Sequence, residues 1–509
     1  MWTHRGALPL RTLALVSVAL ACGGSRVAFA EGIDQAIRTY NEDKYADAAF
    51  LFYDVMLAAP DPATKGKAEY YLAHSLYKAG YLLPAYQFYG EVFTSGEGHP
   101  YFLKAVRGLL RVAAALDDDT LVPGVIDRGY SRAFGYLAEA DSDAAHYLIG
   151  MITQRRGNYA EAKSFLEAVG ERSPYYAKAR YLLAIMAVKT VAEQGSDDYS
   201  EAIRYFSEVE RRLGESKANE DKKLHHLAVL GKARAYYSQG DFKGSVEFYE
   251  KVPRFSEDWY DAMFESGWAY FQTGQFGRAL GMVHAIQSPY FDDRYRAESW
   301  VLKATTYFQL CHFDRVRKTL DDFFRLYEPV AEALIPWLEG EHTDAEMVEV
   351  VVDGNPAFPE QIRRQLANNR RFARFLGHVR RVDSELARAT AEFPEGRFKA
   401  ALLSFFEQER EQRVALTGKL VRQQLKREVA FLDDFLNQAR IIKFETADAE
   451  RKMLEAGKDI TKGPRAKGPR PIVPDATYQY WAFLGEYWLD ELGYYEHSIK
   501  NECVPEVFE

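Results

Sequence analysis

A short pattern of residues recurs through most of residues 31–330, and it constrains the fold more than any other feature of the chain. In its clearest copy, "GNYAEAKSFLEAVGERSP", Gly157 is followed after two positions by Tyr159 and after three more by Ala162. Apolar residues then come four and seven positions later, at Leu166 and Val169. Self-similarity of this kind is typical of solenoids, in which each unit packs against its neighbours.

Other copies keep the same register. The position of the aromatic residue is filled by Tyr45, Leu82, Tyr159, Tyr199, Phe242, Phe276 and, in a weaker last copy, Phe313. The small residue three positions later is Ala48, Ala85, Ala162, Ala202, Ser245 or Ala279. In the last copy, Cys311 stands where a glycine is expected. Residues 100–140 have helical patterning without a clean match, so we expect one or two degenerate repeats there.

The pattern predicts two antiparallel helices joined by a tight turn. Helices approach most closely where small residues meet, and the turn favours Gly or Asp because the chain leaves helical angles there. The aromatic residue after the turn and the apolar residue seven positions later fill the space between successive hairpins. Proline, as at Pro174, closes the unit because it cannot continue a helix. The sequence therefore predicts an all-α stack of helical hairpins.

This unit resembles the tetratricopeptide repeat, a helix-turn-helix of about 34 residues with the form G-x-Y-x-x-A-x-x-x-F-x-x-A-x-x-x-x-P. The resemblance covers roughly Ile33 to Pro329 and implies a solenoid whose first helices line a concave face. It also implies that this face captures a peptide or helix of a partner protein. First-helix residues that are candidates for the groove are Tyr71, Tyr147, Arg234 and Trp268. Most bulky first-helix rings are core, however, so none of them is assigned as a site.

Residues 1–30 have the features of a signal peptide. Arg5 and Arg11 accompany the apolar run "TLALVSVALA", which is too short to span a bilayer. Two cleavage sites compete. The A-F-A sequence ending at Ala30 would release a soluble periplasmic protein, whereas "ALAC" at Cys22 resembles a lipoprotein box and would carry a lipid anchor. We therefore expect export, with the periplasm favoured and an outer-membrane lipoprotein as the near-equal alternative.

Charge and cysteine content limit the kinds of partner and the compartment that we expect. The formal net charge is -9 for the whole chain and becomes about -12 when the three arginines of the leader are removed. Nucleic-acid binding needs basic patches, so we do not expect it. No later stretch approaches the roughly 20 apolar residues of a membrane-spanning helix. Outside the leader, Cys311 and Cys503 remain, and spacing alone does not decide between a disulfide and two free thiols.

The repeat fades after Pro329. Residues 331–395 predict a helical connecting region with a run of arginines, which we interpret as a solvated face; an anionic-ligand site is the alternative. The run consists of Arg363, Arg364, Arg370, Arg371, Arg374, Arg380 and Arg381. Residues 396–460 have near-heptad apolar spacing, interrupted at Glu428, and predict a long helix of up to about 90 Å, or a helical hairpin that bends near Gly418. This element either packs along the solenoid as a cap or pairs with a partner's helix in a coiled coil.

Residues 461–477 read as an extended Lys/Gly/Pro linker, and residues 478–509 are dense in aromatic rings. The rings are Tyr478, Tyr480, Trp481, Phe483, Tyr487, Trp488, Tyr494 and Tyr495. So many rings are unfavourable in solvent, and we expect the segment to dock on the long helix or the solenoid. The alternative is a hook for another protein.

The leader, the repeats, the long helix and the terminal "YQYWAFLGEYWLDELGYY" together resemble envelope proteins of myxobacteria and their relatives. That group includes tetratricopeptide repeat proteins of the adventurous gliding-motility apparatus. The resemblance implies a periplasmic component of a multiprotein envelope machine.

Candidate chemistry is weak throughout the sequence. The adjacent His225 and His226 would point about 100° apart on a helix and share an ion poorly. Three neighbouring carboxylates at 117–119 would diverge in a turn. Glu339, Glu341 and His342 have no recognised ligand spacing. We therefore predict no catalytic, cofactor or metal site.

These features favour a non-enzymatic protein–protein interaction scaffold in a bacterial cell envelope. Its partners would be other envelope proteins, bound through the concave groove and the long helix. The alternative is an assembly or trafficking factor for envelope clients, which a lipid on Cys22 would favour. An enzyme or small-molecule receptor with an unrecognised site is the third and least favoured class.

Overall fold

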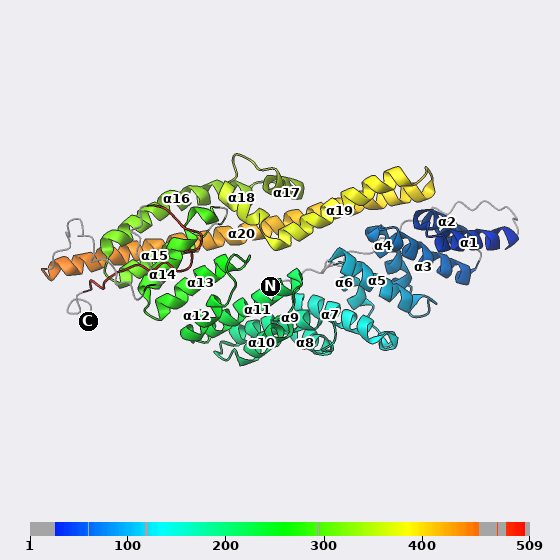
Figure 1. The fold of residues 1–509 in the computed structure, drawn as a ribbon. Helices are drawn as coiled ribbons and strands as arrows, with labels where there is room; N and C mark the ends of the chain where they lie inside the picture. Colours follow the sequence, from blue (N-terminus) through cyan, green and yellow to red (C-terminus); the bar gives the residue numbers. More distant parts are fainter. Residues whose placement is uncertain are drawn as a thin grey trace. The chain divides into compact units, whose positions relative to one another are not determined.

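A computed structural model describes residues 26–59, 61–117, 121–292, 294, 296–457, 476 and 485–503. These residues form twenty α-helices, α1 to α20, with two short 3-10 helices and no strand (Figure 1). The chain divides into two compact units, residues 1–105 and 106–509. The predicted all-α fold is confirmed for the described part of the chain. Residues 1–25, which include Cys22 and most of the predicted signal peptide, lie outside it.

Unit 1 consists of two helical hairpins and the start of a third. Its helices are α1 (Arg26–Asn41), α2 (Tyr45–Ala58), α3 (Pro62–Lys78), α4 (Leu82–Thr94) and the beginning of α5 (Phe102–Leu116). α3 starts sharply because the Asp61 carboxylate accepts hydrogen bonds from the backbone amides of Ala63 and Thr64, at 3.0 and 2.9 Å. Pro62, at the first helical position, has no amide hydrogen to leave unsatisfied.

Unit 2 continues the succession of hairpins. Its helices as far as the end of the stack are the rest of α5, α6 (Leu121–Arg128), α7 (Glu139–Arg155), α8 (Tyr159–Glu167), α9 (Tyr176–Gln194), α10 (Ser200–Leu213), α11 (Asn219–Ser238), α12 (Phe242–Glu250), α13 (Trp259–Gln272), α14 (Phe276–Ile286), α15 (Glu298–Gln309) and α16 (Phe313–Glu339). In the region expected to hold degenerate repeats, the second helix, α6, has eight residues and is followed by a 3-10 helix at Arg132–Tyr136. Odd-numbered helices up to α15 are the first helices of their pairs, and even-numbered helices up to α16 are the second.

The repeat register predicted from sequence matches the turns. The aromatic position opens the second helix in nearly every clear copy, and Tyr199 caps α10. Two residues earlier the backbone is left-handed, with φ of 81° at Gly80 and 82° at Gly157. Asp43 and Cys311 hold the same conformation at the same place, with φ of 59° and 57°. Glycine is favoured there because a Cβ makes this conformation costly.

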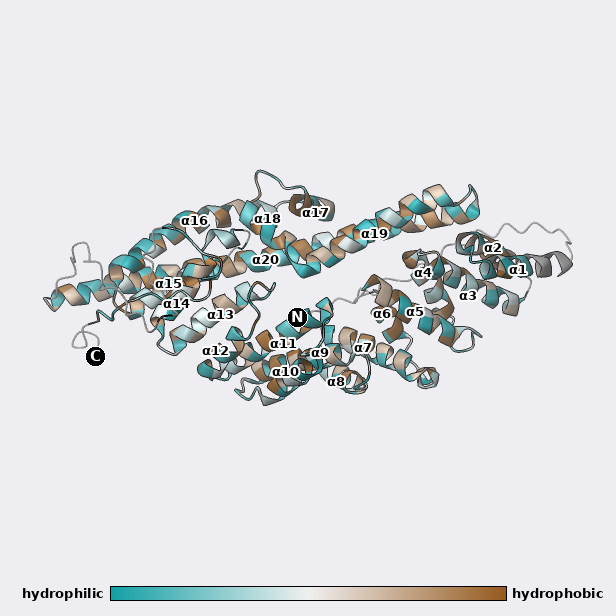
Figure 2. Ribbon diagram, in the orientation of Figure 1, coloured by the Kyte–Doolittle hydropathy of each residue, from teal (hydrophilic) through white to brown (hydrophobic). Residues whose placement is uncertain are grey.

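The small residues of the pattern lie where helices cross. Ala48, Ala85, Ala162, Ala202, Ser245 and Ala279 are all 0% exposed. On the first helices, a Cβ on Gly150 would lie 2.6 Å from Leu166 Cγ, and one on Gly231 would lie 2.5 Å from Phe206 Cζ. Figure 2 shows the result, helices with hydrophobic stripes beside hydrophilic ones. The hairpins are those of a tetratricopeptide solenoid, as predicted.

The stack ends later than the sequence suggests. The expected boundary at residue 330 falls inside α16, which continues through Pro329 and Pro336. Proline lacks an amide hydrogen and usually breaks a helix. Here Val330, Leu334 and Trp337 are buried in a core shared with the C-terminal helices, and this packing holds the helix together.

Four further helices follow α16. They are α17 (Asp344–Val352), α18 (Glu360–Ala367), α19 (Arg370–Glu392) and α20 (Arg397–Glu455). α20 is one continuous helix of 59 residues, about 90 Å long at about 1.5 Å per residue. The alternative of a bend near Gly418 is therefore wrong. A Cβ on Gly418 would overlap the backbone carbonyl of Asp344, so this glycine serves the close approach of α17.

α20 has two differently packed parts. The part that begins at Leu420 contributes Leu420, Val421, Leu425, Leu432, Leu436 and Ala439 to the core that it shares with α15, α16, α17 and α18. This part is the predicted cap on the solenoid. Glu428, which interrupts the apolar spacing, is hydrogen-bonded to Gln365, and burial raises the pKa of its carboxyl group.

The N-terminal part of α20 packs on α19 across a short connection. Their seam contains a polar layer in which the Arg413 guanidinium donates to Glu409 at 2.9 Å and lies 3.0 Å from His378 Nδ1. Arg413 is 6% exposed and Glu385 on α19 is 2% exposed. Outside the seam, Arg410 bonds Asp383 at 2.7 Å.

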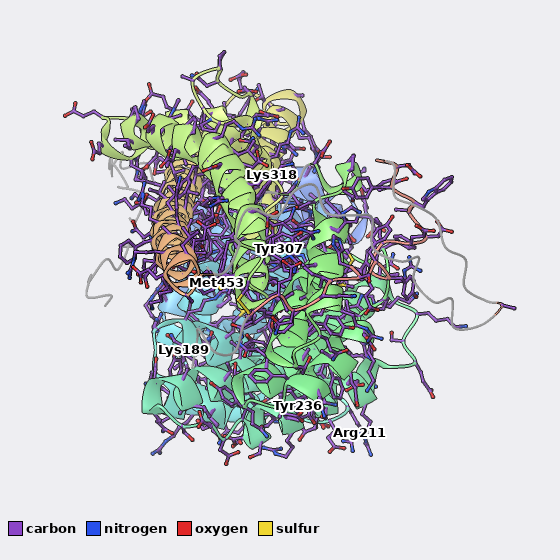
Figure 3. The ribbon with its side chains drawn as sticks, turned by 90° about the vertical axis from the view of Figure 1, so that its left-hand side faces the viewer. Lys189, Arg211, Tyr236, Tyr307, Lys318 and Met453 are labelled. Atoms are coloured by element: carbon purple, nitrogen blue, oxygen red, sulfur yellow. A yellow bond between two sulfur atoms is a disulfide. The ribbon has the colours of Figure 1, made fainter. Side chains whose placement is uncertain are left out.

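The tail segment 485–503, here called the strap, docks on unit 2. Leu492 is 0% exposed, whereas Trp488 and Tyr494 are 55% and 71% exposed. Cys503 forms a disulfide with Cys311, across a Cα–Cα distance of 4.9 Å, so the alternative of two free thiols is wrong. The end of α20 packs by Ala449 and Met453 against Phe313, beside Cys311 (Figure 3).

Docking of the aromatic tail is thus confirmed for the strap. Tyr478, Tyr480, Trp481 and Phe483 lie outside the described residues, as does nearly all of the predicted linker.

Candidate interaction surfaces

The first helices of unit 1 carry a row of half-buried rings, here called the ring face: Tyr40, Tyr70, Tyr71, His74, Tyr77 and Tyr101. Tyr70 stacks on Tyr101 with centroids 4.9 Å apart, and Tyr71 meets Tyr40 edge-on at 5.5 Å. Tyr70 also stacks on His74 at 5.6 Å. The contacts join α1, α3 and Tyr101, which directly precedes α5, so the rings form one surface in unit 1.

Cationic groups border the ring face. The Lys104 ammonium lies 4.9 Å from the Tyr101 ring centroid and 5.7 Å from that of Tyr70. The Glu69 carboxylate lies 3.3 Å from His99 and 3.7 Å from Lys65. Burial raises the pKa of the Tyr101 hydroxyl, which therefore stays protonated at neutral pH. Flat rings beside an exposed ammonium suit apolar and aromatic side chains, with a carboxylate near Lys104.

The candidate groove residues of unit 2 hold neighbouring hairpins together. The Arg234 guanidinium donates two hydrogen bonds to Glu265, at 2.7 and 2.6 Å, which tie α11 to α13. Trp268 Nε1 donates to Glu298 at 3.0 Å and ties α13 to α15. Burial raises the pKa of Glu298. These side chains therefore support the stack.

The four candidate residues do not form one site. Tyr71 lies on α3 within the ring face, and Tyr147 on α7 stacks on Tyr175 with centroids 5.0 Å apart. Arg234 and Trp268 lie on α11 and α13. Of the four, only Tyr71 belongs to a continuous aromatic surface.

The arginine run is largely paired with carboxylates. Arg363 and Arg364 both bond Glu360, and these bonds lower the pKa of its carboxyl group to about 2. At the start of α19, Arg370 contacts Glu257 at 2.9 Å and Asp258 at 3.0 Å, just before α13.

Arg374 lies 3.6 Å from Asp117, beyond the end of α5. The run is divided between α18 and α19 and gathers into no anion site. Its residues at the start of α19 instead connect that helix to the stack.

The weak metal candidates remain separate. The rings of His225 and His226 meet edge-on with centroids 6.0 Å apart, and the His342 ring stacks on Trp337 at 4.4 Å. Asp117 pairs with Arg374, and residues 118 and 119 lie outside the described part. Within the described ranges, no three His, Cys, Asp or Glu side chains are grouped as metal ligands would be. None of the described helices is both long and apolar enough to cross a membrane.

A shallow hollow of about 660 Å³ lies beside the loop between α17 and α18. Its charged lining residues are Asp353, Glu360 and Arg363. Arg363 is already engaged, with Glu360 and with the backbone carbonyl of Val351 at 3.1 Å. The hollow therefore offers no arrangement for catalysis.

The site on α14 that binds the strap was not predicted from the sequence. Gly277 and Gly281 lie one turn apart on α14 and meet the strap's backbone. Their four-residue spacing is the signal that could have indicated a close approach by another chain segment.

No family model matches the chain, and no curated protein sequence matches it. Solved structures with similar folds include a tetratricopeptide repeat protein from Parabacteroides merdae, with 12% identity, a TM-score of 0.24, and coverage of 59% of this chain and 93% of that one. The tetratricopeptide domain of P58(IPK) has 12% identity, a TM-score of 0.19, and coverage of 76% and 99%. Yeast Tom70 has 11% identity, a TM-score of 0.19, and coverage of 84% and 97%. Because these scores are low, the tetratricopeptide fold is assigned from the register of the hairpins themselves.

Proposed function

We propose that the chain is a non-enzymatic protein–protein interaction scaffold of a bacterial cell envelope, and that the ring face of unit 1 binds a segment of a partner protein. The observation that carries this proposal is the continuous row of rings across α1, α3 and the turn before α5, with Lys104 beside it. Aromatic side chains supply large contact areas at low entropic cost and dominate the energetics of many interfaces.

Two observations support the envelope location. Residues 1–30 have the pattern of an export signal. The Cys311–Cys503 disulfide fits an oxidising compartment, because cytosolic thiols are usually kept reduced. We therefore propose the periplasm, with a lipid anchor at Cys22 as the alternative. The assembly suggested by resemblance is the gliding-motility apparatus.

Capture from envelope extracts tests the scaffold. Tagged full-length chain would be compared with Tyr70→Ala/Tyr101→Ala, and with Asp54→Ala, which changes an exposed residue on the second helix α2. We expect one set of proteins, identified by mass spectrometry, to be captured by wild type and Asp54→Ala and lost at least tenfold by the double variant.

Equal capture by all three chains would contradict the role of the ring face. A client protein that loses its place in the envelope when the chain is deleted, without ever forming a stable complex, would indicate an assembly factor instead. The mass of the mature protein distinguishes cleavage after Ala30 from a lipidated Cys22.

A further inference from the structure

The strap lies in a groove with the features of a peptide-binding site. Residues 489–493 of the strap form turns, and residues 494–503 run without helix or strand beside α14 and the turn between α15 and α16 (Figure 1). Its Leu492 side chain is fully buried in the core that includes Trp259 and Met263 of α13. The next residue, Gly493, has a left-handed backbone with φ of 87°, which favours glycine, and lies against the Trp259 ring. The groove thus receives an aliphatic side chain followed by a glycine at a turn.

The floor of the groove is open to a peptide backbone because α14 carries two glycines there. A Cβ on Gly277 would lie 2.5 Å from the carbonyl oxygen of His497, and one on Gly281 would overlap the carbonyl of Tyr495. Both positions are helical, with no left-handed backbone to require glycine. Glycine in a helix interior costs about 1 kcal/mol relative to alanine. The close approach of the strap accounts for both.

The chain holds the strap mainly by its backbone. His497 N donates to the Gly277 carbonyl at 3.0 Å, and Glu502 N donates to the Leu310 carbonyl at 3.0 Å. His312 Nε2 lies 2.7 Å from the Lys500 carbonyl.

Arg254 holds the other end of the strap. Its guanidinium donates to the carbonyls of Asp490 and Leu492, at 2.7 and 3.2 Å. Recognition through main-chain groups with one side-chain pocket is how proteins bind extended peptides.

One covalent bond closes the groove. Cys503 is bonded to Cys311, which occupies the left-handed turn position before α16. Within the described residues, this disulfide is the covalent bond that ties the strap to the stack, beside the non-covalent contacts above.

We propose that this groove is a second peptide-binding site of the chain, and that the strap is its releasable self-ligand. The ligand class is an irregular segment that begins with a turn carrying a buried aliphatic residue and a glycine, with rings on either side. A dithiol reductant would open the site. Its two thiols become a disulfide, the Cys311–Cys503 bond breaks, and each cysteine sulfur gains one hydrogen. The groove belongs to α14 and the neighbouring turns, apart from the ring face, so neither proposal depends on the other.

The test supplies the strap to the full-length chain as a separate peptide. The receptor is full-length chain with Cys311→Ser and Leu492→Asp, which removes the disulfide and the buried anchor but leaves the groove intact. The probe is a fluorescent peptide of residues 486–503 with Cys503→Ser. We expect saturable binding to this receptor, and at least tenfold weaker binding to oxidised wild type, because its own strap fills the groove.

Two controls show that binding uses the groove. Adding Gly281→Leu to the receptor should abolish binding, because the new side chain occupies the path of the peptide backbone. A probe that carries Leu492→Asp should not bind either. Absence of binding by the folded receptor, or equal binding of the two probes, overturns the proposal.

A measurement on the unaltered chain covers the case in which the receptor variant folds poorly. Amide hydrogen exchange of wild type would be followed before and after reduction. We expect faster exchange in the strap and in α14 after reduction, and no change in α9 and α10. Unchanged exchange in the strap would show that the disulfide does not control it.

Discussion

At single positions, the residue type is determined by the local backbone conformation or by the close approach of two backbones. The same left-handed turn residue recurs before six of the second helices; it is glycine at 80, 157, 240 and 274, and it is Asp43 or Cys311 in the other two. Because such positions have a local cause, the sequence predicts them well. The pairing of Cys311 with Cys503 could not be predicted, since 192 residues separate the two and their approach depends on the path of the strap.

Gly231 on α11 tests the crossing of helices at this scale. Gly231→Ala places a Cβ 2.5 Å from the fully buried ring of Phe206, so we expect a loss of unfolding free energy of about 1–3 kcal/mol. The control is Gly377→Ala on α19, where a Cβ meets nothing within 4 Å and should stabilise by up to about 1 kcal/mol. Urea unfolding measures both. Equal effects would refute a role for close packing at Gly231.

Whole elements are fixed by tertiary packing more than by their own sequence. Gly418 suggests a bend when α20 is considered alone, and Pro329 suggests an end to α16. Both helices continue because other elements pack on them, α17 at Gly418 and α20 along α16. Such contacts join distant segments, so local propensity could not reveal them. The heptad spacing still located α20 correctly, because that helix keeps one apolar stripe towards its neighbours.

Neighbouring residues on α20 provide a matched test of its cap role. Leu432 is 1% exposed and Phe431 is 56% exposed. Leu432→Ala should lower the free energy of unfolding by about 2–5 kcal/mol, because it leaves a cavity against the solenoid. Phe431→Ala should change it by less than about 0.5 kcal/mol. If the two variants unfold at the same urea concentration, α20 is not packed as described.

Docking of the strap should depend on pH. Burial, with the nearby charges of His284, Lys303 and Arg315, lowers the pKa of His497 to about 4. An exposed histidine titrates near 6.5. Because the docked state has the lower pKa, docking is fully favoured above about pH 6.5 and weakens as the pH falls towards 4.

Amide exchange of the strap between pH 7 and pH 4, corrected for intrinsic rates, would show this weakening as an added loss of protection. His497→Gln cannot take up the proton and should remove most of that loss. An identical loss in the variant would assign it to other groups.

At the scale of the molecule, the sequence predicted a succession of hairpins, a long helix and an aromatic end. It did not predict the division into two compact units within α5. Nor could it separate the four candidate groove residues into one of the ring face and three elsewhere in the stack. The place of each candidate residue depends on the partner that its side chain contacts, as Arg234 contacts Glu265. The repeat register does not specify these partners.

The disulfide should stabilise unit 2 as a whole. Cys503→Ser removes a cross-link that closes a long loop, and we expect the free energy of unfolding to fall by about 2–4 kcal/mol. Unfolding in urea, followed by tryptophan fluorescence, would be measured with and without a dithiol reductant. The reductant should lower wild type to the level of the variant and leave the variant unchanged. A stability equal to that of oxidised wild type would argue against the cross-link.

The polar layer between α19 and α20 fixes the register of the two helices. Sliding one helix past the other by a turn would part Arg413 from His378 and Arg410 from Asp383. A guanidinium at a nearly dry seam would then lose an acceptor that water could not replace there. Purely apolar seams tolerate such slips, whereas this one has a single setting. The distance over which α19 overlaps α20 is therefore the same in every molecule.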